Sequence, residues 1–509
     1  MKHIFYTLQT KSVFIVSAAL IFSVVVWGII SPNSMNRITT NLMDLMTQNL
    51  GWFYVISTAL YIGFCLYLGI GPYRRMKLGD KDDEPEYSYF AWIGMLFAAG
   101  MGVGLVFWGI GEPLSHFANP PAGTEAGTQE AAERGLLISV FHWGFHPWAI
   151  YAVVALGLAF AKYRKDLPGL VSSSFYPLIG EHVHKWPGKL IDIVAIVATT
   201  VGIATSFGLS TMQFGSGLSH VFGTPNNAWT QLIIVGVVTA IFLISAVSGL
   251  DKGMKYLSIS NLGLAGVLLL TVLIVGPTVF LIEHVSKTIG QYGSSFFEMT
   301  FNTTPYTDNE WMGTWTLFYW AWIISWSPFV GTFIARVSKG RTLGEFMFGV
   351  LVVPTVVTIL WFVVFGGTGL HMELTGQTNF ASDIAETPEV GLYLVLEQLP
   401  LGFIMNLAAL ILIGIFFITS ANSATYVLGV FSSSGNLNPK NNVLITWGLL
   451  ISTIATVLLL SGGLNGLQAI ATITALPFGV IIILMMVAIL RNFKKEGQQK
   501  NKVKEEEDW

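Results

Sequence analysis

The chain has 509 residues, of which 53% are hydrophobic and 11% are charged, and its mean hydropathy is +0.64. Soluble globular domains carry about 25% charged residues, so this composition excludes a soluble protein and indicates one embedded in a membrane. The formal net charge is only −3, and no basic patch interleaved with aromatic residues suggests nucleic-acid binding. The single cysteine, Cys65, excludes a disulfide framework and a cysteine-based metal site.

Apolar runs long enough to cross about 30 Å of hydrocarbon recur along the chain. They predict an all-α membrane protein with twelve spanning helices. The first run is longer than a signal-peptide core and lacks a convincing cleavage site, so we expect it to be retained. The predicted spans are 12–31, 52–71, 89–111, 137–161, 189–209, 230–249, 257–283, 312–335, 346–366, 402–431, 443–461 and 467–490.

The distribution of positive charge predicts the orientation of the chain. Twelve spans place both termini on one side, and if that side is the cytoplasm, only Arg37, Arg134 and Lys287 of the 26 Lys and Arg residues lie outside. This is a strong positive-inside bias. The segment 367–400 carries five acidic residues and no Lys or Arg, as expected of an external loop. The sequence therefore predicts a multi-pass protein of the cell membrane with both termini cytoplasmic.

Two predicted spans contain residues that disfavour a regular helix. The third holds five glycines within FAAGMGVGLVFWGIGEP, and glycine inside a helix costs roughly 0.5–1 kcal/mol relative to alanine. The eighth holds Pro328 in WSPFVGTF, which removes a backbone donor and is expected to interrupt the helix. In transporters built from inverted repeats, broken helices at corresponding positions mark the binding site. Spans 3–7 and 8–12 would be these repeats, although ordinary helix contacts also favour glycine.

Aromatic residues gather on two of the predicted spans. In the fourth span, Trp143, Trp148 and Tyr151 fall within about 140° of one face at about 100° per residue. Trp322 and Trp326 share a face of the eighth span. An interfacial aromatic belt is the alternative explanation, but these residues lie several positions inside the predicted hydrocarbon. Converging rings would form a box for a quaternary ammonium group, each ring contributing about 0.5–2 kcal/mol.

A zwitterionic ligand also needs a partner for its carboxylate. Gly100, Gly102 and Gly104, with Met101 among them, would let the N–H groups of an unwound backbone approach an anion closely. The glycine-rich third span is therefore interpreted as a ligand-binding break in the helix.

Two clusters of hydroxyl groups suit a hard cation such as sodium. The first cluster, in FFITSANSAT, holds Thr419, Ser420 and Ser423, and the second, in ATTVGIATS, holds Thr199, Thr200, Thr205 and Ser206. The alternative is that these hydroxyls bond to their own helix at i−4.

Other chemistry is not favoured by the sequence. His142 and His146 have the spacing of a metal pair, but no glutamate follows the first, and Pro147 breaks the local geometry. Glu112, beside Pro113 at the outer end of the third span, is interpreted as structural or gating. Neither a catalytic motif nor a polar pore ring stands out, so we predict a protein that is not an enzyme or a channel and needs no cofactor.

Four motifs carry a family resemblance: GMGVGLVFWGIGEP, HWGFHPWAIYAVVALGLAFAKYRK, FYWAWIISWSPFVGTFIARVSKGRT and FFITSANSAT. In this order and spacing they resemble the betaine/choline/carnitine transporter family over essentially the whole chain, and look most similar to its sodium-coupled glycine betaine carriers. The resemblance implies a LeuT-like fold of two inverted five-helix repeats behind two N-terminal helices, a homotrimer, and alternating access around an aromatic box. The implied division is two N-terminal helices and a linker (1–84), a first repeat (85–283), an external connection (284–310), a second repeat (311–490) and a cytoplasmic tail (491–509).

The resemblance also assigns site residues. It matches the five aromatic residues above to the substrate box. One sodium site would take the carbonyls of Ala98, Met101 and Phe416 with the hydroxyls of Thr419 and Ser420. Part of a second would take Thr199 and Phe329, with Thr205 or Ser206 in place of a threonine that is Ile203 here.

The chain departs from the family pattern at several positions. Betaine carriers usually read WAWWISW where this chain reads WAWIISW, so Ile323 replaces a tryptophan that would face the ammonium group. Asn422 replaces an aspartate. Choline carriers tend to have aspartate where this chain has Gly104, which favours a zwitterion such as betaine over choline.

The sequence thus predicts sodium-coupled import of glycine betaine or a related zwitterionic compatible solute for osmoprotection. The alternatives are a sodium-independent exchanger of carnitine- or betaine-type substrates and a choline or ectoine carrier. Sodium-independent members of the family replace the hydroxyl ligands with a bulky or cationic side chain, so Thr419 and Ser420 argue against the exchanger.

Overall fold

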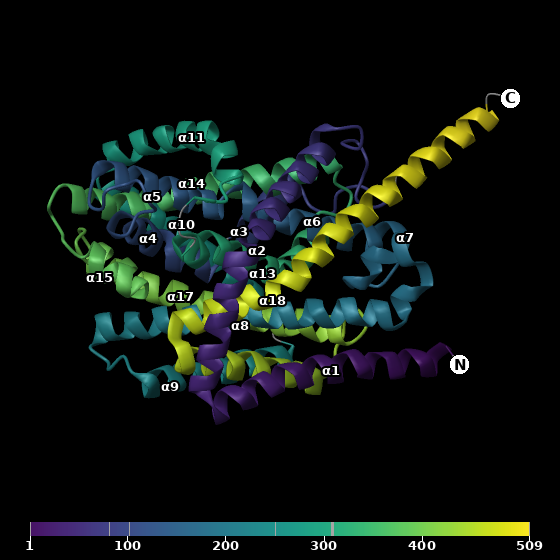
Figure 1. The fold of residues 1–509 in the computed structure, drawn as a ribbon, viewed down its shortest axis with the longest axis horizontal. Coiled ribbons are helices and arrows are strands. Elements are labelled where there is room, and N and C mark those ends of the chain that lie inside the picture. The colour runs from purple at the N-terminus through teal and green to yellow at the C-terminus, as the bar shows by residue number, and fades with distance from the viewer. Residues whose placement is uncertain (1, 81, 101, 250, 307–309, 508–509) are drawn as a thin grey trace.

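The computed structural model describes residues 2–80, 82–100, 102–249, 251–306 and 310–507, which are mainly helical (Figure 1). The helices are α1 (Lys2–Ile30), α2 (Pro32–Ile70), α3 (Tyr89–Gly100), α4 (Val103–Ala118), α5 (Gln129–Trp143), α6 (Phe145–Lys165), η1 (Ser172–Phe175), α7 (Tyr176–Ile179), η2 (Gly180–His184), α8 (Trp186–Phe222), α9 (Ala228–Ser248), α10 (Asp251–Val275), α11 (Thr278–Thr300), α12 (Glu310–Met312), η3 (Gly313–Leu317), α13 (Phe318–Val337), α14 (Leu343–Leu374), α15 (Ala381–Glu386), η4 (Pro388–Val390), α16 (Gly391–Glu397), α17 (Gly402–Ser432) and α18 (Asn441–Glu507).

Among the described residues, ten helices are long and apolar enough to cross a membrane. One of them, within α18, contains the last two predicted spans, and it breaks at Gly463, where φ is +56°. That left-handed conformation favours glycine. The predicted third span is divided between α3 and α4, with 12 and 16 residues. The apolar segments therefore lie close to where they were predicted, except that the seventh span, 257–283, is interrupted, because α10 ends at Val275 and α11 begins at Thr278. The count of twelve crossings stays a prediction.

The interruption predicted in the third span is confirmed. α3 ends at Gly100 and α4 begins at Val103, and Gly102 between them is extended, with φ −139° and ψ 178°. Met101 lies outside the described residues. No side chain caps the first turn of α4, so its leading backbone N–H groups are left for other acceptors.

The interruption predicted at Pro328 is wrong, because α13 continues through this residue as a regular helix. Proline leaves the carbonyl four residues earlier without its usual donor. Here that carbonyl belongs to Ile324, and the hydroxyl of Ser327 donates to it at 2.7 Å. The irregular backbone lies earlier instead, in the π-helical turn η3.

Segments predicted as connections contain further helices. The predicted external connection 284–310 includes most of α11, whose buried residues Leu281, Thr288 and Tyr292 recur at helical spacing while Val279 and Phe297 are exposed. The acidic segment 367–400, which was predicted to be external, contains α15, η4 and α16. Only spanning-length apolar runs were predicted as helices, so these shorter or amphipathic helices were missed.

The helices that carry the predicted site pack together in the interior. α13 packs along α6, α8 and α18. α8 also packs against α17, and α4 packs against α5 and α14.

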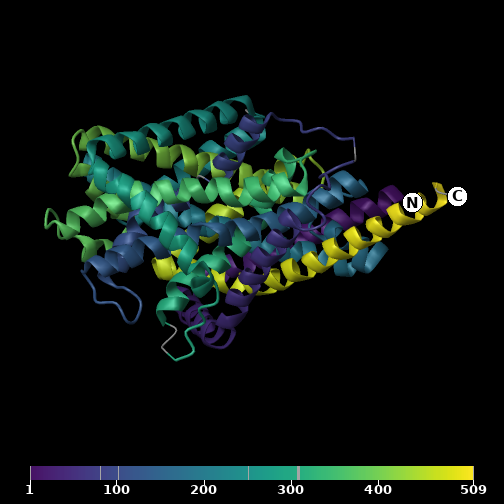
Figure 2. The same cartoon turned by 90° about the horizontal axis from the view of Figure 1, so that it is seen from above.

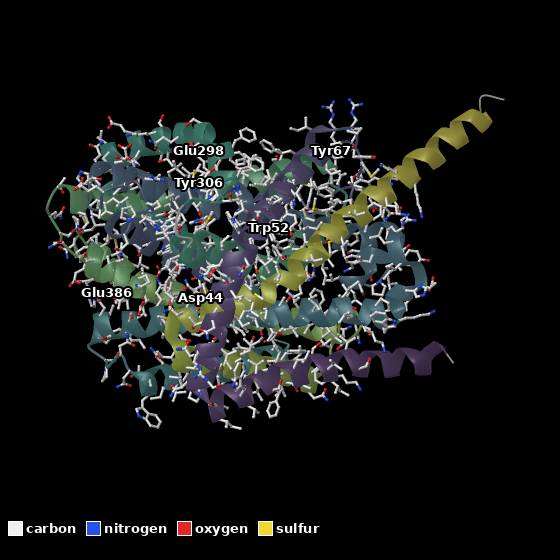
Figure 3. The ribbon with its side chains drawn as sticks, viewed as in Figure 1. Asp44, Trp52, Tyr67, Glu298, Tyr306 and Glu386 are labelled. Carbon is white, nitrogen blue, oxygen red and sulfur yellow. The ribbon has the colours of Figure 1, made fainter. Side chains whose placement is uncertain are left out.

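Both ends of the chain lie at the same end of the molecule (Figures 1 and 2). Aromatic side chains such as Trp52 and Tyr67 on α2 point outward (Figure 3), and each is about half exposed, as expected of residues that face lipid or its interface.

Candidate functional site

A small cavity lies where α13 and α6 meet the start of α4. Its volume is about 20 Å³, which is room for about one water molecule. The residues that line it are Gly102, Gly104, Leu105, Trp143, Tyr151, Trp322, Ile323 and Trp326. A larger ligand would therefore have to move these side chains apart.

The structure brings four of the five predicted box residues to this cavity. Trp143 and Trp322 meet edge to face, with ring centroids 5.8 Å apart, and Tyr151 and Trp326 meet at 6.3 Å. Trp148 is buried and packs against the ring of Tyr151 at 5.5 Å, away from the cavity wall. The expected shared face assumes one straight helix, whereas the chain bends at Gly144 between α5 and α6.

Gly104 allows the two tryptophans to close over the backbone. A Cβ at this position would lie 2.6 Å from Cη2 of Trp143 and 2.7 Å from Cη2 of Trp322. Both distances are far below van der Waals contact, so any side chain here, such as the aspartate of choline carriers, would displace both rings. The indole N–H of Trp322 is held by the carbonyl of Gly202 at 3.2 Å.

Ile323 also lines the cavity and is only 2% exposed. The expectation that this position faces the box therefore agrees with the geometry. The side chains of the wall are four aromatic rings and two aliphatic groups, Leu105 and Ile323.

A second cavity of about 20 Å³ adjoins the first and shares Gly104 and Trp326 with it. It brings together three predicted sodium ligands, Ser206 of α8, Phe329 of α13 and Ser420 of α17. Ile203, which replaces a family threonine, lines it as well.

Four of the five predicted hydroxyl ligands, Ser206 among them, donate to a carbonyl of their own helix. Thr419 donates to the carbonyls of Ile415 at 2.8 Å and Phe416 at 3.3 Å. The other three donate to the carbonyl four residues earlier: Thr199 at 2.6 Å, Thr205 at 3.0 Å and Ser206 at 3.3 Å. The hydroxyl of Thr205 also lies 3.4 Å from a second acceptor, the carbonyl of Leu467 in α18. The i−4 bonding considered as the alternative is thus present, and it leaves each hydroxyl oxygen able to accept or to ligate a cation.

Three residues that were predicted as sodium ligands or substrate contacts remain without a described environment. Met101 lies outside the described residues. Ala98 and Gly100 lie in the last turn of α3, and their surroundings are not described.

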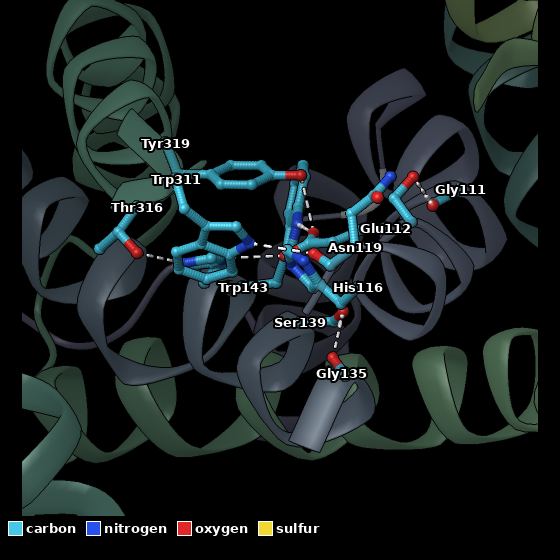
Figure 4. A network of polar contacts seen from close by, with 12 residues as sticks. Gly111, Glu112, His116, Asn119, Gly135, Ser139, Trp143, Trp311, Thr316 and Tyr319 are labelled. Atoms are coloured by element: carbon cyan, nitrogen blue, oxygen red, sulfur yellow. Dashed lines mark hydrogen bonds and ion pairs between the residues drawn. The ribbon is translucent and has the colours of Figure 1, made fainter. Parts of the chain in front are cut away.

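A buried polar network next to Trp143 was not predicted (Figure 4). Glu112 on α4 is fully buried, and its Oε2 accepts from the indole N–H of Trp143 at 3.0 Å and from the hydroxyl of Tyr319 at 2.7 Å. Its Oε1 lies 2.5 Å from Nδ1 of His142 and 3.3 Å from Nε2 of His116. The available signal was an ionisable residue inside an apolar segment, which is unusual in a membrane.

The two histidines of the predicted fourth span contact different hydroxyl groups. Nε2 of His142 lies 2.9 Å from the hydroxyl of Thr316, whereas Nε2 of His146 lies 3.0 Å from that of Thr300. Glu112, His116 and His142 place one ligand atom each within 4.8 Å of one another, the spacing of a possible metal site. However, the direct contact between Glu112 and His142 occupies the position that a metal ion would need.

Comparison with known proteins identifies the family to which this chain is similar. The model of the betaine/carnitine/choline family transporter (BCCT) matches residues 12–498. The glycine betaine transporter OpuD of Bacillus subtilis is 46% identical over 501 residues, covering 98% of this chain and 96% of that protein. The ectoine/hydroxyectoine transporter of Virgibacillus pantothenticus is 42% identical, covering 96% of this chain and 97% of that protein.

A solved structure supports the fold. MhsT, crystallised in complex with L-phenylalanine, matches 79% of this chain and 89% of its own, with a TM-score of 0.51 and 16% identity. At this identity the likeness shows the fold alone, which is that of a LeuT-fold transporter.

Proposed function

Because the chain belongs to the betaine/carnitine/choline family of transporters, we propose that it imports glycine betaine, or a related zwitterionic compatible solute, by sodium symport for osmoprotection. The observation that carries this proposal is the cavity walled by Trp143, Tyr151, Trp322 and Trp326. Aromatic faces attract a quaternary ammonium group through their ring quadrupoles. Among the residues that the structure describes, no carboxylate lines this cavity, which suits a ligand that brings its own.

The start of α4 supports the zwitterionic part of the proposal. Gly102 and Gly104 line the same cavity, and the first turn of α4 has no side-chain cap. Backbone N–H groups at a helix N-terminus favour an anion. A substrate carboxylate would bind there while its ammonium group binds the rings.

The adjoining cavity supports sodium as the coupling ion. Ser206, Ser420 and the backbone near Phe329 offer oxygen atoms at its wall, and oxygen ligands are what a hard cation requires. One charge moving through 100 mV releases about 2.3 kcal/mol, and a tenfold sodium gradient adds about 1.4 kcal/mol. Two sodium ions would therefore supply roughly 7 kcal/mol, enough for about a 10⁵-fold substrate gradient.

Ectoine is the second candidate substrate, and Ile323 is the observation that favours it. This residue places an aliphatic side chain on the box wall where betaine carriers usually have tryptophan, so a ring-shaped zwitterion would meet a less crowded wall.

For the assembly and location of the protein, we propose a homotrimer in the cell membrane with both termini in the cytoplasm.

The proposal is tested by uptake of radiolabelled glycine betaine into proteoliposomes. An inward sodium gradient is compared with an equal potassium gradient, with unlabelled ectoine as competitor. We expect concentrative uptake only with sodium. Uptake that ignores sodium but rises with betaine preloaded inside would instead establish an exchanger.

The sodium site is tested in the same assay by Thr419→Val. The matched control is Thr425→Val on the same helix, because Thr425 makes the same i−4 bond, to Ala421 at 2.8 Å, and is also buried. Losing one oxygen ligand is expected to raise the half-saturating sodium concentration about tenfold for Thr419→Val. Equal values for the two variants would remove Thr419 from the site.

A further inference from the structure

Glu112 has the surroundings of an ionised carboxylate built into the protein interior. It is fully buried, and its two oxygens contact four polar hydrogen-bonding groups, from Trp143, Tyr319, His142 and His116. An ionised carboxylate only accepts hydrogen bonds and has about four lone-pair sites. With both imidazoles in the tautomer that donates to it, its acceptor capacity is filled.

These contacts converge on one residue of the cavity wall. The indole of Trp143 donates to Glu112 at one edge, while the opposite edge of the ring, at Cη2, lies against Gly104. Tyr319 and Trp143 also meet edge to face, at 5.5 Å. The carboxylate and Gly104 thus fix the ring of Trp143 from two sides.

The carboxylate itself is not on the cavity wall. Its influence on a ligand must pass through the ring that it holds. A negative charge bonded to an indole N–H also polarises the ring, and a more electron-rich face attracts a cation more strongly.

We propose that Glu112 is a positioning residue for substrate recognition: its carboxylate fixes Trp143 in the box and strengthens the attraction of that ring for the cationic head of the substrate. This inference rests on the proposed function, since it takes the aromatic cavity as the ammonium site. Glu112 would thus contribute to the affinity for the cationic head of the substrate, although its carboxylate lies outside the cavity.

The test is a double-mutant cycle on the purified full-length protein, with glycine betaine binding measured by titration calorimetry at saturating sodium. The variants are Glu112→Gln, Trp143→Phe and the two combined, because phenylalanine keeps a ring but has no N–H. Each single change is expected to raise Kd about tenfold. The double variant is expected to match Trp143→Phe alone, since Glu112 then has no indole to hold.

A second measurement separates this role from general loosening of the fold. The competitor 3,3-dimethylbutanoate has the shape of glycine betaine but carries a tert-butyl group in place of the ammonium. The wild type should prefer betaine strongly, and Glu112→Gln should lose a several-fold part of that preference. Asp192→Asn is the matched control, because Asp192 is also buried but hydrogen-bonds to Ser172, outside the box; its preference should be unchanged.

The outcomes are distinct. If the effects of the two changes multiply in the double variant, giving about a hundredfold rise in Kd, the role of Glu112 is overturned. The same holds if Glu112→Gln keeps the wild-type preference for betaine over 3,3-dimethylbutanoate. Both results leave the proposed function intact. A wild type that binds no betaine would overturn the proposed function. If Glu112→Gln does not fold, Tyr319→Phe replaces it in the cycle, and an equal effect with and without Trp143→Phe would overturn the inference.

Discussion

At Gly104 the absence of a side chain shapes the cavity. Trp143 and Trp322 approach this position so closely that a methyl group would lie within 2.7 Å of both rings. The residue therefore acts through the space it leaves for the rings, in addition to any backbone contact with a ligand.

Gly104→Ala is expected to raise the Kd for glycine betaine about tenfold, because overpacking costs about 1–3 kcal/mol and must move both tryptophans. Binding by titration calorimetry measures the effect. Gly94→Ala is the control, because a Cβ at Gly94, in the preceding helix α3, meets no atom within 4 Å. Comparable losses in both variants would show that helix propensity, and not the rings, is responsible.

At the scale of single residues, the sequence pattern is most informative where the cavity-lining side chains share one face of a single helix. Trp322 and Trp326 lie one turn apart, and both line the cavity. The network of Glu112 was missed because two of its partners, Trp143 and Tyr319, lie 31 and 207 residues away along the chain. Trp148 is not among the residues that line the cavity, although it packs against Tyr151 of the same helix, so its assignment to the box stays a prediction.

At the scale of elements, two helices with unfavourable residues behave differently. The third predicted span breaks at Gly102, whereas α13 passes through Pro328. The difference is local hydrogen bonding: the carbonyl of Ile324, orphaned by proline, accepts from Ser327 at 2.7 Å. A serine next to a proline can thus keep a buried helix regular.

Ser327→Ala is expected to lower the apparent Tm by about 1–2 °C, because it leaves a buried carbonyl unpaired at a cost of about 1–3 kcal/mol. In the background Pro328→Ala, the restored backbone N–H can serve that carbonyl, so the same change should cost much less. Thermal unfolding of the four proteins in detergent measures both effects. An identical loss in both backgrounds would refute the role given to Ser327.

At the scale of the whole molecule, hydropathy predicted most of the architecture. Apolar runs located the long helices because the bilayer demands about twenty apolar residues for each crossing. They could not reveal α11 or the helices within 367–400, which are shorter or amphipathic and owe their order to packing against the bundle. The cavities were also beyond prediction, because they arise where α4, α5, α6, α8, α13 and α17 meet.

The orientation of the molecule can be tested by cysteine labelling. Cys65, the single natural cysteine, is fully buried, so it should add little background. Glu125→Cys and Lys440→Cys place exposed thiols in two different loops. With cytoplasmic termini, a membrane-impermeant maleimide applied to intact cells should label position 125 and should label position 440 only after lysis. The reverse pattern would invert the predicted topology.

The two adjoining cavities have one more consequence, because Gly104 and Trp326 belong to the walls of both. An occupant of either cavity that shifts this shared partition changes the room left for the other occupant. For the two proposed ligands the resulting coupling is reciprocal: the factor by which sodium changes betaine affinity must equal the factor by which betaine changes sodium affinity. A partition of two residues would thereby couple the binding of ion and solute, with no need for a signal carried across the bundle.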